Sequence, residues 1–252
     1  HVKNDVKQGV ILDTSINAAL VTLSRKLANF INQPLKKSEY KPINEFNDAL
    51  FAQAMISYES DWHTSISFFE SYLSLNPNSV IAMIYLSKLY LWDNQTAKAA
   101  DLLEKSANIL IEDPLEVANI QLLKGRVSAK KQNFTQALQF YKQVTNITDK
   151  QQDWFLKASV AEEQGFVYLK QKRLNKSLEA FTNALSAYQI IQSQIGINST
   201  RLHLAEVLFL QGNIVQAKEN YTKAKESIKS IKLEFLYSML EEYKIKFDNR
   251  LD

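Results

Sequence analysis

The sequence predicts an all-α protein in which about five helical hairpins stack into a solenoid. Three observations support this fold class. Only five glycines and four prolines occur among the 252 residues, and a β-sandwich or barrel needs many more turn residues. Apolar residues recur at helical spacing along most of the chain. Small and large side chains also recur at fixed offsets every 34 to 40 residues, which is typical of a repeat architecture.

The composition excludes several classes of protein. An apolar fraction of 46% is too high for a disordered chain. A net charge of +3 is too small for a nucleic-acid-binding domain. Without cysteine the chain has no disulfide, thiolate zinc site, iron–sulfur cluster or cysteine nucleophile. No segment approaches the ~18 apolar residues of a membrane span.

Residues 1–43 are expected to form an N-terminal segment distinct from the repeats. Residues 6–12 predict a short strand, and Leu12 to Ile31 carries the apolar stripe of an amphipathic helix. Residues 33–43 hold two prolines and predict a loop. Because the chain starts at His1 and shows no signal sequence, we interpret it as part of a longer protein with any membrane anchor or effector domain upstream.

Residues 44–252 are expected to form the helical pairs. Asp61, Asn133 and Asn213 each precede an apolar-periodic segment and are suited to accept hydrogen bonds from first-turn amides. Gln136 and Gln216 follow two of them by three residues, as in a capping box. A last helix from about residue 233 is expected to cover the open end of the stack with the apolar stripe Leu236, Leu240, Tyr243 and Phe247.

The repeat is visible as three columns of equivalent residues. Two columns lie on the second helix of each predicted hairpin, and one lies on its first helix. A small residue is followed four positions later by a large one, and another mostly small residue stands twelve positions earlier. Small residues let two helices cross closely, and a large side chain one turn along fills the space beside the crossing. The columns are Ser65, Ala99, Ala137, Ser177 and Ala217; Phe69, Leu103, Tyr141, Phe181 and Tyr221; and Gln53, Ser87, Gly125, Gly165 and Ala205.

These columns, together with Asp61 to Phe69 and Leu73 to Pro77, resemble the tetratricopeptide repeat pattern. Residues 132–138 and 212–217 resemble the turn into its second helix. The resemblance covers about residues 44–230 and implies a right-handed superhelix. The chain departs from the pattern at the usual early aromatic position, and the consensus proline is clear only at Pro77.

A second resemblance concerns the order of a long helix, a proline-containing loop and the first repeat. This order is similar to the C-terminal sensor half of ToxR-like membrane-anchored winged-helix transcription activators. It implies a periplasmic domain whose DNA-binding part lies outside this sequence. Without that resemblance, a cytoplasmic location is expected.

The inventory of catalytic groups is small. His203 and Glu206 stand three residues apart on one helix, but two ligands make a weak metal site, so a surface or packing role is expected. The adjacent pairs Glu162–Glu163 and Glu241–Glu242 point about 100° apart and predict solvated faces. The chain has no Gly-x-Ser-x-Gly elbow and no glycine-rich phosphate loop. We therefore expect no enzyme activity, no metal and no cofactor.

The tetratricopeptide resemblance implies that the first helix of each pair lines a concave groove. Carried onto this chain, the resemblance places charged and polar residues near the centre of the groove. It also places the aromatic rings of Phe166 and Phe209 on the groove face, where a ligand would cover them. The expected ligand is a protein or peptide with an acidic centre and apolar flanks. The candidate groove residues are Lys88, Asn119, Arg126, Lys130, Glu162, Phe166 and Phe209.

The sequence thus favours a non-catalytic protein-binding scaffold, as the sensing or docking part of a larger bacterial regulator. Two alternatives stay open. One is a self-association module that uses Trp62, Trp92 and Trp154 as contact residues. The other is a helical-array enzyme or lipid-pocket protein, which an enclosed apolar cavity with convergent histidine and carboxylate groups would support.

Overall fold

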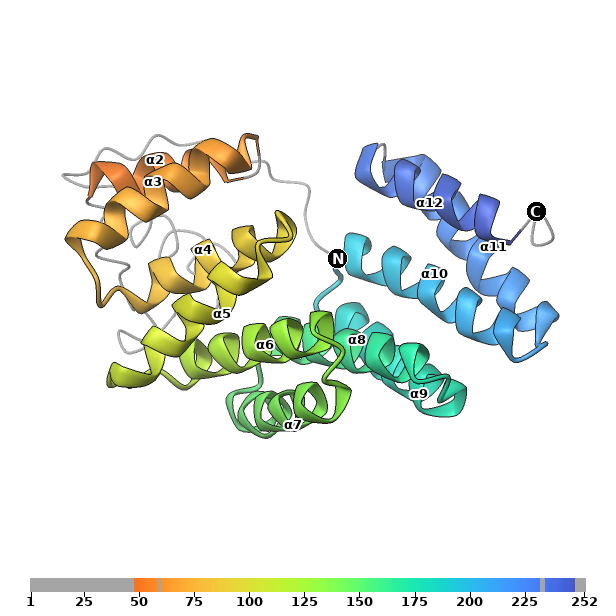
Figure 1. The fold of residues 1–252 in the computed structure, drawn as a ribbon. Coiled ribbons are helices and arrows are strands. Elements are labelled where there is room, and N and C mark those ends of the chain that lie inside the picture. The colour runs from red at the N-terminus through yellow and green to blue at the C-terminus, as the bar shows by residue number, and fades with distance from the viewer. Residues whose placement is uncertain (1–47, 59, 232–233, 248–252) are drawn as a thin grey trace, which may run out of the picture. The chain divides into compact units, whose positions relative to one another are not determined.

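The computed structural model describes residues 48–58, 60–231 and 234–247. These residues form eleven α-helices and one short 3-10 helix. The expected strand, helix and loop within residues 1–43 lie outside the described residues. The helices are α2 (Ala49–Ser57), α3 (Trp62–Leu75), α4 (Val80–Trp92), α5 (Thr96–Lys105), η3 (Ser106–Asn108), α6 (Pro114–Lys130), α7 (Phe134–Gln151), α8 (Trp154–Lys170), α9 (Leu174–Ile190), α10 (Gln194–Leu210), α11 (Ile214–Ile231) and α12 (Glu234–Lys246) (Figure 1).

The described residues divide into two compact units, the first ending at Leu89 and the second beginning at Tyr90. In the first unit, α2 packs against α3 through aromatic side chains. The ring of Phe51 lies 5.4 Å from that of Phe69 and 5.3 Å from that of Tyr72, both edge to face. Tyr85 stacks on Phe69 at 5.9 Å. The expected domain boundary at residue 43 stays a prediction.

The second unit consists mainly of three antiparallel hairpins, α6–α7, α8–α9 and α10–α11 (Figure 1). Successive hairpins stack through contacts of α7 with α8 and of α9 with α10. The outer helices α7, α9 and α11 bury one face only. By contrast, α10 buries every residue from Gly196 to Leu208 except Ser199 and Arg201. First helices therefore lie inside the stack, and the all-α repeat fold expected from the sequence is confirmed.

With one exception, the repeat columns have the packing role predicted for them. All five small residues of the first column are fully buried, including Ala137 and Ala217. The large residues of the second column are at most 1% exposed. Two members of the third column face rings of the second: Gly125 lies against Tyr141 and Gly165 against Phe181, with no room for a Cβ. The prediction fails at Gln53, which is exposed, because Ser65 in the first hairpin bonds to the carbonyl of Ala54 instead. The hydroxyl of Ser177 also donates to the carbonyl of Gly165 across the hairpin at 2.8 Å.

The turns inside the hairpins repeat as closely as the helices do. Asn94, Gln132, Lys172 and Gly212 all have a left-handed backbone, with φ between 57° and 79°. This conformation lets the next amide bond back to a helix carbonyl, as between Arg173 N and Tyr168 O at 2.9 Å. Only the last of these four turns uses glycine, the residue that adopts positive φ without strain.

The predicted caps are confirmed in part. The Asp61 carboxylate accepts from the amide of Thr64 at 3.1 Å. Asn133 occupies the N-cap position of α7 but makes no side-chain cap bond. The predicted capping box there is wrong, because the Gln136 amide oxygen instead accepts from the Ser128 hydroxyl at 3.1 Å. The Gln136 side chain therefore links α7 to α6 and does not cap the first turn of α7.

The helix expected to close the stack is present as α12. It contacts α10 and α11. Its predicted apolar residues and Phe247, which directly follows it, are at most 5% exposed. They join one core with Leu202 of α10 and Tyr221 of α11. None of the helices in the described part of the chain has the length and hydropathy needed to span a membrane.

Candidate functional site

A set of polar side chains lies along the inner helices of the second unit, hydrogen-bonded in clusters that meet at the adjacent Glu162 and Glu163 of α8. We call it the polar network. Because first helices are packed on most sides, charged residues placed on them are largely removed from water and need partners. The network consists of Arg126 on α6, Tyr141 on α7, Glu162 and Glu163 on α8, Tyr188 on α9, Thr200, His203 and Glu206 on α10, and Tyr243 and Lys246 on α12.

One end of the network is an ion pair between successive hairpins. The Arg126 Nε donates to Glu163 Oε1 at 2.8 Å, and the Tyr141 hydroxyl donates to Glu163 Oε2 at 3.3 Å. Burial, the largest single influence, would lower the pKa of Arg126, but Glu163, Tyr141 and Glu162 together outweigh it and leave the pKa raised. The Arg126 charge is therefore neutralised within the protein.

The centre of the network is the carboxylate of Glu162. It accepts hydrogen bonds from the hydroxyls of Tyr188 at 3.2 Å and Thr200 at 3.4 Å. The Nε2 of His203 lies 3.4 Å from its Oε1. In the described residues, no lysine or arginine forms an ion pair with Glu162. The electrostatic interaction of Arg126 with Glu162 is weaker than its interaction with Glu163.

His203 connects the centre to the far end of the network. Its Nδ1 lies 2.6 Å from the hydroxyl of Tyr243, which also lies 3.2 Å from Glu206 Oε2. Glu206 pairs with the amine of Lys246 at 2.5 Å. The imidazole is buried between rings, with that of Phe166 at 4.6 Å. Polar groups thus lie near both ring nitrogens, and the rings of Phe166 and Phe181 pack around the imidazole.

The three tyrosines of the network are hydrogen-bond donors throughout the ordinary pH range. Burial, and then the charge of Glu163, raises the pKa of Tyr141. Burial and Glu162 raise the pKa of Tyr188, and burial and Glu206 raise the pKa of Tyr243. A protonated phenol donates a hydrogen bond, so each tyrosine is a donor to the carboxylate that it faces.

The structure corrects one expectation and confirms another. The prediction that Glu162 and Glu163 form a solvated face is wrong. Their side chains are only 19% and 22% exposed, because neighbouring hairpins cover this face of α8. The packing role expected for His203 is confirmed. Across the described residues, no group of three or more histidine or acidic side chains is arranged to hold a metal ion.

The remaining candidate groove residues are dispersed. Asn119 donates to Leu115 O on its own helix at 2.9 Å, and exposed Lys130 donates to Asn94 Oδ1 at 2.8 Å. The Phe209 ring packs 5.2 Å from that of Phe247. Lys88 belongs to the first unit and lies over the ring of Tyr85, so its predicted place in the groove stays a prediction.

The structure therefore brings together Arg126, Glu162 and Phe166 of the predicted site. The sequence analysis did not include Glu163 or Lys246 in the site. It also missed two tyrosines that donate to carboxylates, Tyr188 of α9 and Tyr243 of α12. The repeat length could have pointed to these residues, because many hydrogen-bond partners in the network lie about one repeat apart in the sequence. The separation is 37 residues for Arg126 and Glu163 and 40 for His203 and Tyr243.

Comparison with known proteins places this architecture in a family. The model of the family described as "Soluble NSF attachment protein, SNAP" matches residues 48–243. The regulatory protein RapK of Bacillus subtilis (strain 168) is 25% identical over 238 residues, which cover 88% of this chain and 62% of RapK. The chain thus spans less than two thirds of that relative's length.

Solved structures support the same fold. Aspartyl phosphate phosphatase F from Bacillus subtilis has a TM-score of 0.66 at 13% identity, covering 90% of this chain and 65% of its own. The apo form of RapI has a TM-score of 0.62 at 15% identity, with coverage of 80% and 82%. A thermophilic tetratricopeptide protein of Thermus thermophilus has a TM-score of 0.57 at 18% identity, with coverage of 78% and 97%. The tetratricopeptide resemblance is confirmed, whereas the ToxR-like resemblance stays a prediction.

Proposed function

The chain belongs to the soluble NSF attachment protein family, and on that premise we propose that it is a protein-binding scaffold of a bacterial regulator rather than an enzyme. The relative RapK is named a regulatory protein, and we extend a regulatory role to this chain. The stacked inner helices of the second unit provide the binding face.

The observation that carries this proposal is the charge balance of the polar network. Glu163 faces Arg126 and Glu206 faces Lys246, whereas Glu162 has hydroxyl groups and an imidazole as its near partners. A half-buried carboxylate without a permanent cation is suited to a positively charged ligand group. The ligand class we propose is a protein segment with a lysine or arginine that reaches Glu162.

This ligand differs from the acidic-centred peptide expected from sequence. That expectation took Lys88, Arg126 and Lys130 as the positive centre, and the 2.8 Å pair with Glu163 offsets the charge of Arg126. The rings of Phe166 and Tyr188 lie near Glu162 or its partner His203. They offer apolar and cation–π contacts to the stem of a basic side chain. Binding would also stiffen adjacent hairpins, because each hairpin is stabilised by its neighbours.

Peptide display tests the proposal. A library of random 12-residue peptides is selected on the purified 252-residue chain, and enriched peptides are titrated by calorimetry. Enriched peptides are expected to share a lysine or arginine, and Glu162→Gln is expected to weaken their binding at least about tenfold. Gln keeps an acceptor for Tyr188 and Thr200, so the fold is expected to survive.

The control is Glu179→Gln, which removes one charge from the exposed outer face of α9. It is expected to leave every affinity within about twofold. Enriched peptides without a basic residue, or equal affinities for the Glu162→Gln and unmodified chains, would disprove the assignment of Glu162 as the ligand-binding group.

A further inference from the structure

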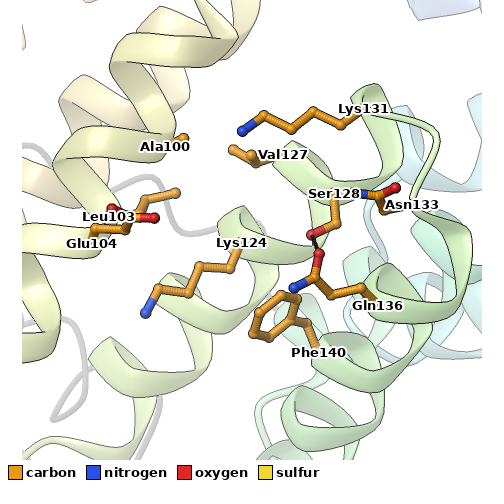
Figure 2. Close-up of a pocket in the computed structure, with 10 residues that line it drawn as sticks. All are labelled: Ala100, Leu103, Glu104, Lys124, Val127, Ser128, Lys131, Asn133, Gln136 and Phe140. Atoms are coloured by element: carbon orange, nitrogen blue, oxygen red, sulfur yellow. Dashed lines mark hydrogen bonds between the residues drawn. The ribbon is translucent and has the colours of Figure 1, made fainter.

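A second candidate surface lies outside the polar network, between α5 and the α6–α7 hairpin. It is a groove of about 340 Å³ (Figure 2). Leu103 of α5, Val127 of α6 and Phe140 of α7 give it apolar walls. The hydrogen bond between Ser128 and Gln136, drawn in Figure 2, links α6 to α7 at one side. The groove is therefore lined by three helices, of which α6 and α7 are linked by this bond and α5 contacts α6.

Lys124 of α6 and Lys131, the residue directly after α6, border this groove. Lys124 and Lys131 are seven residues apart, which places them on the same face of the helix and about 10 Å apart along it. Figure 2 shows both side chains extending from α6 toward the side occupied by α5, with Val127 between them. Neither amine forms a hydrogen bond or ion pair with any residue in the described part of the chain, so both are available to a ligand.

The chemistry of the groove selects a particular kind of ligand. Two ammonium groups without acceptors favour two anionic groups at a similar spacing. The apolar walls between them favour an apolar side chain at the midpoint. A carboxylate, Glu104, also lines the groove, and it disfavours a ligand with a continuous run of phosphates. An amphipathic helix with two acidic residues seven positions apart and a leucine between them meets all three conditions.

We propose that the groove between α5 and α6–α7 docks an acidic amphipathic helix of a partner protein. This interaction uses no residue of the polar network and does not depend on the proposed role of Glu162. The chain would then hold two segments of opposite charge, a basic one at the inner helices and an acidic one at this groove. A scaffold that joins two partners needs two such separate surfaces.

Matched peptides test this proposal. The probe is a fluorescein-labelled, alanine-rich 18-residue helical peptide with two glutamates seven residues apart and a leucine midway. A second peptide carries lysines at those two positions. Fluorescence anisotropy on the full chain is expected to show binding of the glutamate peptide, stronger at low salt. Lys124→Glu combined with Lys131→Glu is expected to weaken that binding at least tenfold and to create binding of the lysine peptide.

The control combines Lys142→Glu with Lys150→Glu, which changes the net charge equally on exposed positions of α7. It is expected to leave both affinities within about twofold. Equal effects of the two double variants would show attraction by net charge alone and overturn the proposal. So would displacement of the peptide by a short DNA duplex or polyphosphate at lower concentration than unlabelled peptide. Glu162→Gln is expected to change nothing in this assay, so failure here is distinct from failure of the proposed function.

Discussion

Gly165 of α8 lies directly against the ring of Phe181 on α9. A Cβ at Gly165 would stand 2.6 Å from Cε1 of that ring, which is closer than real contacts allow. The preceding hairpin repeats the arrangement, with 2.2 Å between a Cβ at Gly125 and Cε1 of Tyr141. In these two hairpins the third and second repeat columns are thus two sides of one contact, in which a missing side chain makes room for a ring.

Gly165→Ala is expected to destabilise the protein by about 1–3 kcal/mol. Alanine normally stabilises a helix interior by up to about 1 kcal/mol relative to glycine, so the sign of the effect identifies the contact. Urea unfolding followed by circular dichroism measures the change. The double variant Gly165→Ala with Phe181→Leu is expected to be less unstable than the sum of the two single variants. A stabilising Gly165→Ala would disprove the steric account.

The sequence predicted the helical repeat well because spacing and side-chain size act locally. Ala137 and Tyr141 are four residues apart, so their shared face follows from helical geometry alone. The polar network was not predicted, because burial of Glu163 depends on how the next hairpin stacks. A carboxylate pair on one helix has the same pattern whether solvent or a neighbouring hairpin covers it. Comparing charges one repeat apart would have suggested Arg126 as its partner.

The ion pair of Arg126 and Glu163 is expected to contribute to the free energy of unfolding, because each charge neutralises the other in a partly buried site. Arg126→Met leaves a half-buried carboxylate with only Tyr141 as partner, and a loss of about 1–3 kcal/mol is expected because the pair is partly solvated. Glu163→Gln is expected to cost a similar amount. The double variant should lose less than the sum, with a coupling of about 1 kcal/mol or more in a double-mutant cycle. Strict additivity would contradict the ion pair.

The tyrosines of the polar network are expected to make the fold sensitive to alkaline pH. Their pKa values are raised in the folded protein by burial and carboxylates, while in the unfolded chain they are near 10. Above about pH 10 the unfolded chain therefore binds fewer protons than the native one, and stability falls as the pH rises. The maximum slope is about 1.4 kcal/mol per pH unit for each tyrosine.

Free energies of unfolding at pH 8, 9.5 and 11 test this dependence. Tyr243→Phe is expected to lower stability at pH 8, because the bond to Glu206 is lost, but to lose less stability between pH 9.5 and 11 than the unmodified chain. Tyr168→Phe, which removes a partly buried phenol outside the network, serves as the control. Equal slopes for Tyr243→Phe and the unmodified chain would show that this phenol is not responsible.

Leu236 of α12 is fully buried in the core that α12 shares with α10 and α11. Leu236→Ala is expected to cost about 2–4 kcal/mol, because the cavity forms where α12 covers the last hairpin. Since repeat proteins are stabilised between neighbours, the damage should stay local. Hydrogen exchange is expected to accelerate in α10 to α12 while α6 to α9 keep their protection. Ile245→Ala, at a position 78% exposed on the same helix, should alter neither stability nor exchange. Uniform acceleration across α6 to α12 would instead indicate one cooperative core and contradict the neighbour-stacked fold.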